Sequence, residues 1–261
     1  MKLVAMSGYE KLRYIYENNL TVELLAENLI TCSVDDHASD VKNTMIRKDY
    51  DIFGVREKDR VIGFVKRDDL NSDDQKIENF VRKFSADNLI SDSTSLIELL
   101  DIFQDKEFIF ILERNSVSKI VTVADLQKQP IRMLAFSLIS LLEMYLIALI
   151  KQYYPNESWI PLLSESRLDM AKKLMDTRME NNEALTLLDN TQLGDKGTIV
   201  QKTLEMVDKL GFESKSQCRD FFKKIEKLRN NTAHSQQKIY HDNNEFIALI
   251  LQIERVIKNS I

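Results

Sequence analysis

Three groups of residues in this chain have the types and spacing that chemistry on a phosphate requires. The first is the hexapeptide Arg229-Asn230-Asn231-Thr232-Ala233-His234, close to the C-terminal end. Histidine exchanges a proton near neutral pH, and arginine is a permanent cation whose planar fork binds phosphate oxygens. Together they could cleave RNA through attack of its own 2′-hydroxyl on the neighbouring phosphate, a reaction that needs no metal.

The spacing of this hexapeptide limits how its side chains can meet. Five residues rotate by about 500° on an ideal helix, so Arg229 and His234 would lie roughly 140° apart, whereas Asn230 and His234 share a face. The outer two side chains converge only if the helix ends near Ala233 or if two protomers share the site. Taken singly, Arg229 could instead form a surface ion pair, and His234 could be a histidine stabilised by the helix dipole.

The other two groups end the two copies of an internal repeat. KDYDIFGVREKDRVIGFVKRDDL (48–70) aligns without a gap on QDKEFIFILERNSVSKIVTVADL (104–126), 56 residues later. The pattern of each copy predicts a short extended piece, a helix and two strands: helices over 38–48 and 95–104, and strands over 51–56, 60–65, 107–113 and 117–122. The last strands run into Val65-Lys66-Arg67-Asp68-Asp69 and Val121-Thr122-Val123-Ala124-Asp125.

This β-α-β-β unit, present twice, resembles a pair of cystathionine-β-synthase (CBS) motifs. The resemblance covers about 22–128 and implies two motifs, 22–72 and 82–128, that pack by their sheets into one module. It also implies that the Ser/Thr and Asp of the strand-terminal signature hold an adenine nucleotide (ATP, ADP or AMP) as a regulatory ligand. Thr122 and Asp125 match that signature completely.

The first copy departs from the signature. It keeps the acid as Asp69 but places Lys66 where the hydroxyl belongs, which weakens a ribose site there. Lys66 and Arg67 could instead meet a polyphosphate, whereas a carboxylate accepts from both ribose hydroxyls. Asp69 and Asp125 could equally serve only as caps of the helices that follow them.

After Pro130 the β pattern stops and helical spacing begins. Stretch 131–150 is long enough to span a membrane, but Arg132 and Glu143 favour the central helix of a bundle or a dimer interface. Glu143 could pair with Arg229, either structurally or to orient it. The spacing predicts a bundle of four or five helices, over 131–153, 166–178, 198–210, 214–233 and 243–258.

The position of the hexapeptide late in such a bundle resembles the HEPN family, which is largely metal-independent endoribonucleases with some noncatalytic relatives. The resemblance covers about 131–261 and implies a homodimer with RNA as substrate and a site at the dimer interface. It makes Arg229 and His234 the catalytic pair, with Asn230 and Glu143 as further candidates. Stress, toxin-like or antiviral work would follow from the same resemblance.

Composition narrows the function classes. A net charge of −5 argues against a protein that coats nucleic acid through bulk positive charge. Two cysteines and three dispersed histidines predict no metal site and suit a reducing compartment, and the charged start of the chain predicts no signal peptide, so a cytoplasmic location is expected. The short Gly194–Gly197 segment is no phosphate loop, so nucleotide hydrolysis is not expected.

The sequence therefore predicts an α+β chain: an N-terminal helix (1–21), the CBS-like tandem repeat (22–128) and an all-α HEPN-like bundle (129–261). The expected function is a nucleotide-regulated, metal-independent endoribonuclease that needs no cofactor for catalysis and acts away from membranes. The alternatives are a noncatalytic nucleotide-sensing and dimerising adaptor, or a regulatory subunit of a larger enzyme.

Overall fold

The computed structural model describes residues 8–70, 75–181, 185–233 and 238–259. The chain divides into two compact units: a mixed unit, Leu20–Lys128, and a helical unit built from the residues before and after it. The predicted α+β class, with a β/α module preceding a helical region, is confirmed. His234 lies outside the described residues.

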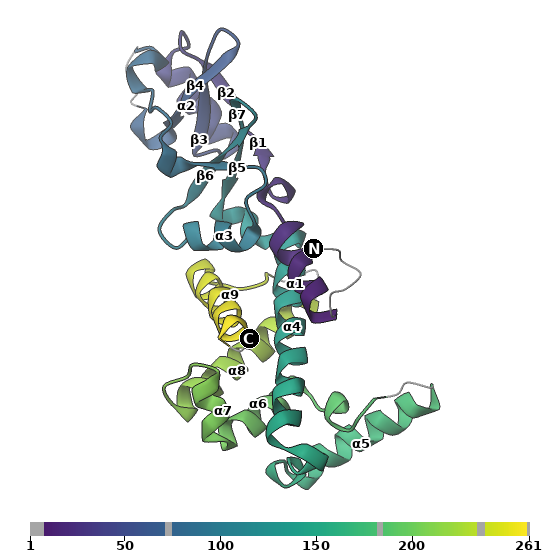
Figure 1. Ribbon diagram of the computed structural model, residues 1–261. Helices are drawn as coiled ribbons and strands as arrows, with labels where there is room; N and C mark the ends of the chain where they lie inside the picture. The colour runs from purple at the N-terminus through teal and green to yellow at the C-terminus, as the bar shows by residue number, and fades with distance from the viewer. Residues whose placement is uncertain (1–7, 71–74, 182–184, 234–237, 260–261) are drawn as a thin grey trace. The chain divides into compact units, whose positions relative to one another are not determined.

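The mixed unit contains the same order of elements twice. The first copy comprises β2 (Thr31–Ser33), α2 (Ala38–Lys48), β3 (Ile52–Glu57) and β4 (Arg60–Lys66), and the second comprises β5 (Leu89–Ser91), α3 (Leu96–Ile102), β6 (Phe108–Glu113) and β7 (Ser116–Thr122). In each copy the first strand is parallel to the second, which pairs antiparallel with the third. The short strand β1 (Glu27–Asn28) adds to the second sheet beside β7 (Figure 1).

Backbone details repeat at the same offset as the sequence. The register of the β3–β4 pair shifts at Val55, and that of the β6–β7 pair shifts at Ile111, 56 residues later. The two turns are also equivalent, because Lys58 and Arg114 both have positive φ, 52° and 56°. The repeat seen in the sequence is therefore a repeat of the backbone.

Phenylalanine side chains fill the space between the two sheets. The rings of Phe64 on β4 and Phe110 on β6 lie 4.8 Å apart between centroids, and Phe84 and Phe108 pack against them. Each fully buried ring of this kind stabilises the fold by about 1.5–3 kcal/mol. This aromatic cluster ties the two copies into one unit and so fixes the relative position of their strand ends.

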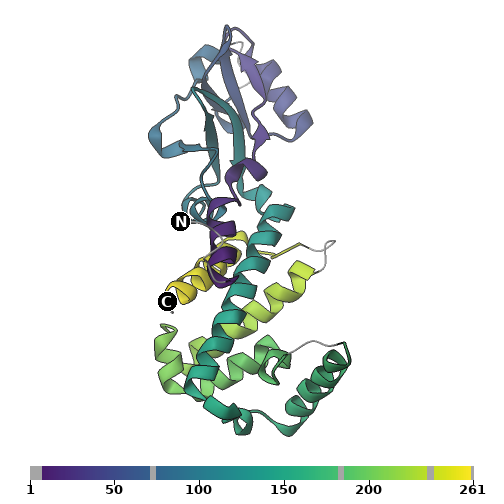
Figure 2. The same ribbon diagram turned by 45° about the vertical axis from the view of Figure 1, so that its right-hand side comes forward.

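The helical unit is built around one long apolar helix, α4 (Gln129–Tyr153), which packs against α1, α6, α8 and α9 (Figures 1 and 2). Among the described residues, α4 alone is long and apolar enough to cross a membrane, and half of its most apolar stretch is buried inside the unit. The other helices are α1 (Gly8–Asn18), α5 (Glu165–Glu180), α6 (Leu193–Lys202), α7 (Leu204–Lys209), α8 (Lys215–Ala233) and α9 (Asn243–Lys258). Short 3-10 turns connect them and the strands: η2 (Val22–Leu24), η3 (Arg67–Asp69), η4 (Ile77–Phe80), η5 (Ala86–Asn88), η6 (Val123–Gln127), η7 (Pro155–Glu157), η8 (Ile160–Leu162) and η9 (Leu188–Asn190).

One predicted helix, 198–210, is wrong. The structure has α6 and α7 there, separated at Thr203, whose backbone is extended (φ −116°, ψ 103°). The Thr203 hydroxyl donates to the Ile199 carbonyl at 3.0 Å and lies 2.6 Å from the Tyr154 hydroxyl. These side-chain contacts end α6, which a periodicity argument does not detect.

The Gly194–Gly197 segment is the first turn of α6. A Cβ at Gly197 would stand 2.6 Å from Cγ of Phe222, so this glycine allows α6 and α8 to approach closely.

Helix α5 is mostly exposed. Ala171 is its one buried residue, and the helix extends away from the other helices of the unit (Figures 1 and 2).

Candidate functional site

A cavity of about 320 Å³ opens in the mixed unit where equivalent strand ends of the two copies meet. We call it the strand-end cavity. Three pairs of equivalent positions line it, together with Arg67 and Asp68: Asp51 and Glu107, Ile52 and Phe108, and Lys66 and Thr122. Its walls are therefore related by the repeat, and their chemistry differs where the copies differ in sequence.

The cationic side of the strand-end cavity comes from the first copy. The Lys66 ammonium lies 4.8 Å from the centroid of the Phe108 ring, a cation–π contact. The Arg67 guanidinium forms an ion pair with Asp51, Nη2 to Oδ1, at 2.6 Å. Both cations are held by weak or partly exposed partners, so an anionic group entering the cavity can replace those contacts.

Thr122 and Asp125 form a reciprocal cap at the start of η6. Oδ2 of Asp125 accepts from the Thr122 backbone N–H at 2.7 Å and from its hydroxyl at 3.1 Å, and Oδ1 pairs with Lys128 at 2.7 Å. Burial opposes the charge of Lys128, but its hydrogen bonds to Asp125 and Glu27 outweigh burial and raise its pKa. Asp125 is thus engaged as a cap and is not among the residues that line the strand-end cavity, whereas Thr122 is.

Asp69 faces a different partner. Its two carboxylate oxygens each accept a hydrogen bond of 2.6 Å from the Arg82 guanidinium, a two-pronged ion pair. The hydrogen bond from Arg82 holds the pKa of the Asp69 carboxyl below its usual value. The acid retained in the first copy is therefore satisfied by a residue outside the repeat alignment, and it does not line the strand-end cavity.

A second cavity, of about 520 Å³, lies in the helical unit, and we call it the arginine cavity. Four parts of the unit meet around it: α4, α5, the segment from η9 to the start of α6, and α8. Its lining residues are Ser140, Glu143, Met144, Ile147, Leu174, Arg178, Asp189, Asn190, Thr191, Gln192 and Arg229. The size falls within the range of small-ligand sites.

The structure brings Arg229 and Glu143 to the same cavity but does not pair them. Oε1 of Glu143 instead accepts from Lys196 Nζ at 3.0 Å, which corrects the expected pairing with Arg229. The Lys196 side chain is fully buried, and its ammonium also donates to the Thr191 carbonyl at 2.7 Å. A buried cation needs such partners, and Glu143 supplies the charged one.

Arg229–Ala233 of the hexapeptide form the last turn of α8 that the structure describes, and His234 follows outside the described residues. Within the described part of the chain, the guanidinium of Arg229 has no hydrogen bond or ion pair, so it is available to a ligand. Asn230 is exposed and does not line the cavity.

Arg178, Asn190 and Gln192 were not found by sequence reasoning. Nη1 of Arg178 donates to Oδ1 of Asn190 at 3.2 Å, and Asn190 is almost fully buried. These residues come from the end of α5 and from the irregular segment before α6, where no repeat or motif marks them. An arginine one helical turn after Leu174, on the same face of α5, was the single available signal.

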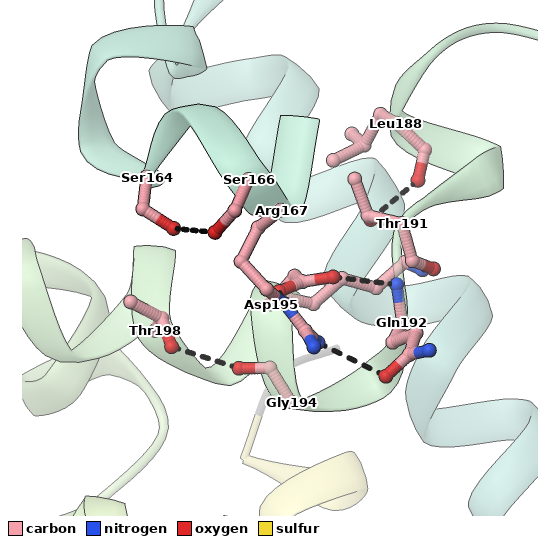
Figure 3. A network of polar contacts seen from close by, with 10 residues as sticks. Ser164, Ser166, Arg167, Leu188, Thr191, Gln192, Gly194, Asp195 and Thr198 are labelled. Atoms are coloured by element: carbon pink, nitrogen blue, oxygen red, sulfur yellow. Dashed lines mark hydrogen bonds and ion pairs between the residues drawn. The ribbon is translucent and has the colours of Figure 1, made fainter. Parts of the chain in front are cut away.

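A polar network fixes the segment that carries Gln192 (Figure 3). Asp195 caps α6 by accepting from the Gln192 backbone N–H at 2.9 Å, and its other oxygen accepts from Arg167 Nε at 2.5 Å. Arg167 also donates from Nη2 to the Gln192 side-chain oxygen at 3.0 Å. The start of α6 is therefore held rigidly beside the arginine cavity.

The acidic residue Asp189 lines the same cavity. Burial opposes its charge, but hydrogen bonds from the Thr186 N–H and hydroxyl, at 2.8 and 2.5 Å, hold the pKa of its carboxyl below its usual value. The Asp189 carboxylate is thus an anion whose charge is already stabilised by hydrogen bonds within the protein.

Within the described residues, no cluster of three or more His, Cys, Asp or Glu side chains could hold a metal ion.

Comparison with known proteins identifies one part of the chain. The family model for the CBS domain matches residues 22–73, which include the first copy of the repeat, so this segment is a CBS domain. CBS domains commonly bind adenine nucleotides, which indicates a nucleotide-sensing regulatory role for this domain. No curated protein matches the chain.

Solved structures resemble part of this chain at low sequence identity. The CBS domains of a transcriptional regulator from Streptococcus pneumoniae are 20% identical, with 41% of this chain and 97% of that chain covered and a TM-score of 0.36. An uncharacterized conserved protein from Pyrococcus horikoshii is 20% identical, with 42% and 90% covered and a TM-score of 0.36. A conserved CBS domain protein of unknown function from Thermoplasma acidophilum is 16% identical, with 41% and 66% covered and a TM-score of 0.36.

Proposed function

We propose that this protein is a metal-independent endoribonuclease whose activity is set by an adenine nucleotide. The observation that carries the catalytic half is the place of Arg229, a guanidinium without a described partner in a cavity that also contains two carboxylates, Glu143 and Asp189, and a second guanidinium, Arg178. The CBS match and the chemistry of the strand-end cavity support the regulatory half. The test of the whole is cleavage of labelled RNA in EDTA, with and without adenine nucleotides.

In this proposal the nucleotide binds in the strand-end cavity. Lys66 and Arg67 would meet its phosphate, and the Thr122 hydroxyl would accept from or donate to its ribose or phosphate oxygens. Phe108 offers an apolar surface beside them. Asp125 would act indirectly and would not contact the nucleotide, because its hydrogen bonds to Thr122 hold that residue in place. The binding residues thus come from both copies of the repeat.

A nucleotide bound in this way is expected to stabilise the fold. Ligand at about 100 times its Kd adds about 2.7 kcal/mol to the free energy of unfolding. Thermal unfolding with ATP, ADP or AMP measures the shift, and Lys66→Ala should reduce it strongly. Lys83→Ala, an exposed lysine of the same unit that does not line the cavity, is the matched control. Equal shifts in both variants, or none in the wild type, would refute the site.

In the proposed cleavage, His234, Arg229 and Asn230 each have one role. The substrate's 2′-oxygen attacks the phosphorus, the P–O5′ bond breaks, and a 2′,3′-cyclic phosphate and a 5′-hydroxyl result. His234 would accept the 2′-hydroxyl proton and then give it to the departing 5′-oxygen. Arg229 would stabilise the negative charge of the phosphorane. Asn230, four residues before His234 in the sequence, would orient that histidine or the RNA.

We propose that the protein works as a homodimer through the exposed face of α4. Met133, Phe136 and Met144 are 58%, 60% and 43% exposed on this helix, an apolar face that a second copy would cover. Light scattering should then give about twice the chain mass of 30.4 kDa. Phe136→Glu, at an already exposed position, should shift the protein toward the monomer. A monomeric wild type at micromolar concentration would contradict the proposal.

The alternative is a noncatalytic adaptor that senses a nucleotide and dimerises, or a regulatory subunit that uses its CBS module alone. It is favoured if nucleotide binding and dimerisation occur without any RNA cleavage. The strand-end cavity supports this reading as well, because sensing does not require the arginine cavity to react.

A further inference from the structure

A third cavity, of about 430 Å³, lies in the helical unit, and we call it the α6 cavity. It is distinct from the arginine cavity, with which it shares no lining residue. Gly194, Thr198 and Lys202 follow one another at steps of four, so they share one face of α6 and extend over about 12 Å. The residues that line the cavity are Leu162, Leu163, Ser164, Arg167, Gly194, Asp195, Thr198, Lys202 and Glu226.

Two charged residues of the α6 cavity already form an ion pair. Oδ1 of Asp195, whose side chain is 6% exposed, accepts from Nε of Arg167 at 2.5 Å (Figure 3). Nη2 of Arg167 also donates to the Gln192 side-chain oxygen at 3.0 Å, which fixes the guanidinium on the start of α6. The two charges cancel, so this pair forms a rigid wall, and the charge of a ligand is set by the other two charged residues.

Those two residues, Lys202 and Glu226, are opposite in charge but do not pair with each other. Nζ of Lys202 donates to the Leu162 carbonyl at 2.6 Å, a neutral acceptor, so two of its three N–H donors remain for a ligand. Within the described part of the chain, the Glu226 carboxylate has no hydrogen bond or ion pair. It lies against the first turn of α6, where a Cβ on Gly194 would stand 3.0 Å from its Oε1, whereas Lys202 ends the helix. The helix dipole favours each charge at its own end of α6, which stabilises the two charges apart from each other.

We propose that the α6 cavity binds a small zwitterion, a molecule whose ammonium and carboxylate groups are joined by a short apolar chain. The ammonium pairs with Glu226 and the carboxylate pairs with Lys202. The methylene groups lie against Leu162 and Leu163, which line the same cavity. A helical lysine side chain leans toward the start of its helix, so the two charges are closer together than about 12 Å, and a chain of about six carbons spans most of that distance. The site uses no residue of the strand-end cavity or the arginine cavity, so it is independent of the proposed function.

The test uses 6-aminohexanoate as the probe, with hexylamine and hexanoate as partners that each lack one of its charges. Isothermal titration calorimetry of the full chain at neutral pH and low salt gives the three Kd values. 6-Aminohexanoate should bind saturably, and hexylamine and hexanoate should each bind about 5- to 10-fold more weakly, the effect of one lost charged contact at a partly exposed site.

Two variants assign the ends of the ligand. Glu226→Gln should weaken binding of 6-aminohexanoate about 5- to 10-fold and leave that of hexanoate unchanged, because only the ammonium contact is lost. Lys202→Gln should weaken 6-aminohexanoate equally and leave hexylamine unchanged. Glu205→Gln and Lys209→Gln are the matched controls, exposed residues of α7 that do not line the α6 cavity, and should change no Kd.

Each outcome bears on the inference. Absence of saturable binding of 6-aminohexanoate overturns it, and so does equal affinity for hexylamine or hexanoate. Unchanged binding in Glu226→Gln and Lys202→Gln, or an equal loss in Glu205→Gln and Lys209→Gln, places the probe elsewhere and also overturns it. The ligand series on the wild type decides the matter if a variant does not fold.

Discussion

In EDTA, purified protein is expected to cut labelled RNA and leave 2′,3′-cyclic phosphate and 5′-hydroxyl ends. The nucleophile is the 2′-hydroxyl of the RNA itself, so DNA of the same sequence, which lacks this group, should not be cut. Arg229→Ala should lower the cleavage rate about 10²- to 10³-fold through lost charge stabilisation. His234→Ala should lower it about 10²- to 10⁴-fold, the usual effect of a positioned acid or base. End-group analysis and single-turnover rates measure these effects.

The double variant decides whether the two residues act together. If they serve one transition state, the combined loss is markedly smaller than the product of the single losses. Arg229→Lys should restore little activity, because an ammonium lacks the planar fork. Lys223→Ala is the matched control, an exposed cation on α8 that does not line the arginine cavity. Equal residual cleavage by the wild type and His234→Ala would identify a contaminating nuclease and favour the adaptor.

The fold of the mixed unit could be predicted from the sequence because its signals are local and occur twice. Helix α2, over Ala38–Lys48, has the predicted bounds, and the strands of both copies agree within a residue. The alternation of buried and exposed residues sets a strand, and the repeat confirms each assignment with a second instance. The break at Thr203 was missed since a side chain bonded to its own helix leaves no periodic trace.

The surroundings of the candidate sites could not be predicted from the sequence. Thr122 and Arg229 line cavities whose other residues no motif names, and the roles predicted for the two residues stay predictions. Asp69 forms its ion pair with Arg82, a residue outside the two aligned segments of the repeat. Lys196 lies 53 residues from Glu143, and only the packing of α6 on α4 brings them together. Ion pairs between distant elements follow from tertiary packing, for which no residue spacing is diagnostic.

Breaking the Glu143–Lys196 ion pair is expected to destabilise the fold whatever the function of the protein. Lys196→Met should lower the free energy of unfolding by about 3 kcal/mol, because it leaves Glu143 without its cation and the Thr191 carbonyl without its donor. That figure is at the low end for breaking a buried pair, since the Glu143 side chain is 25% exposed. Denaturant titration of the full chain, followed by far-UV circular dichroism, measures the change.

A double-mutant cycle tests the origin of that loss. Lys196→Met combined with Glu143→Leu should be much less destabilised than the sum of the single variants, because replacing both members of a buried pair by apolar side chains removes the unpaired charge. Lys151→Met is the matched control: its ammonium is about half exposed and lies 3.7 Å from Asp189, so its loss should cost at most about 1 kcal/mol. Additive losses in the cycle would mean that Lys196 stabilises α6 through packing alone, and that Glu143 is held at the arginine cavity by something other than its ion pair.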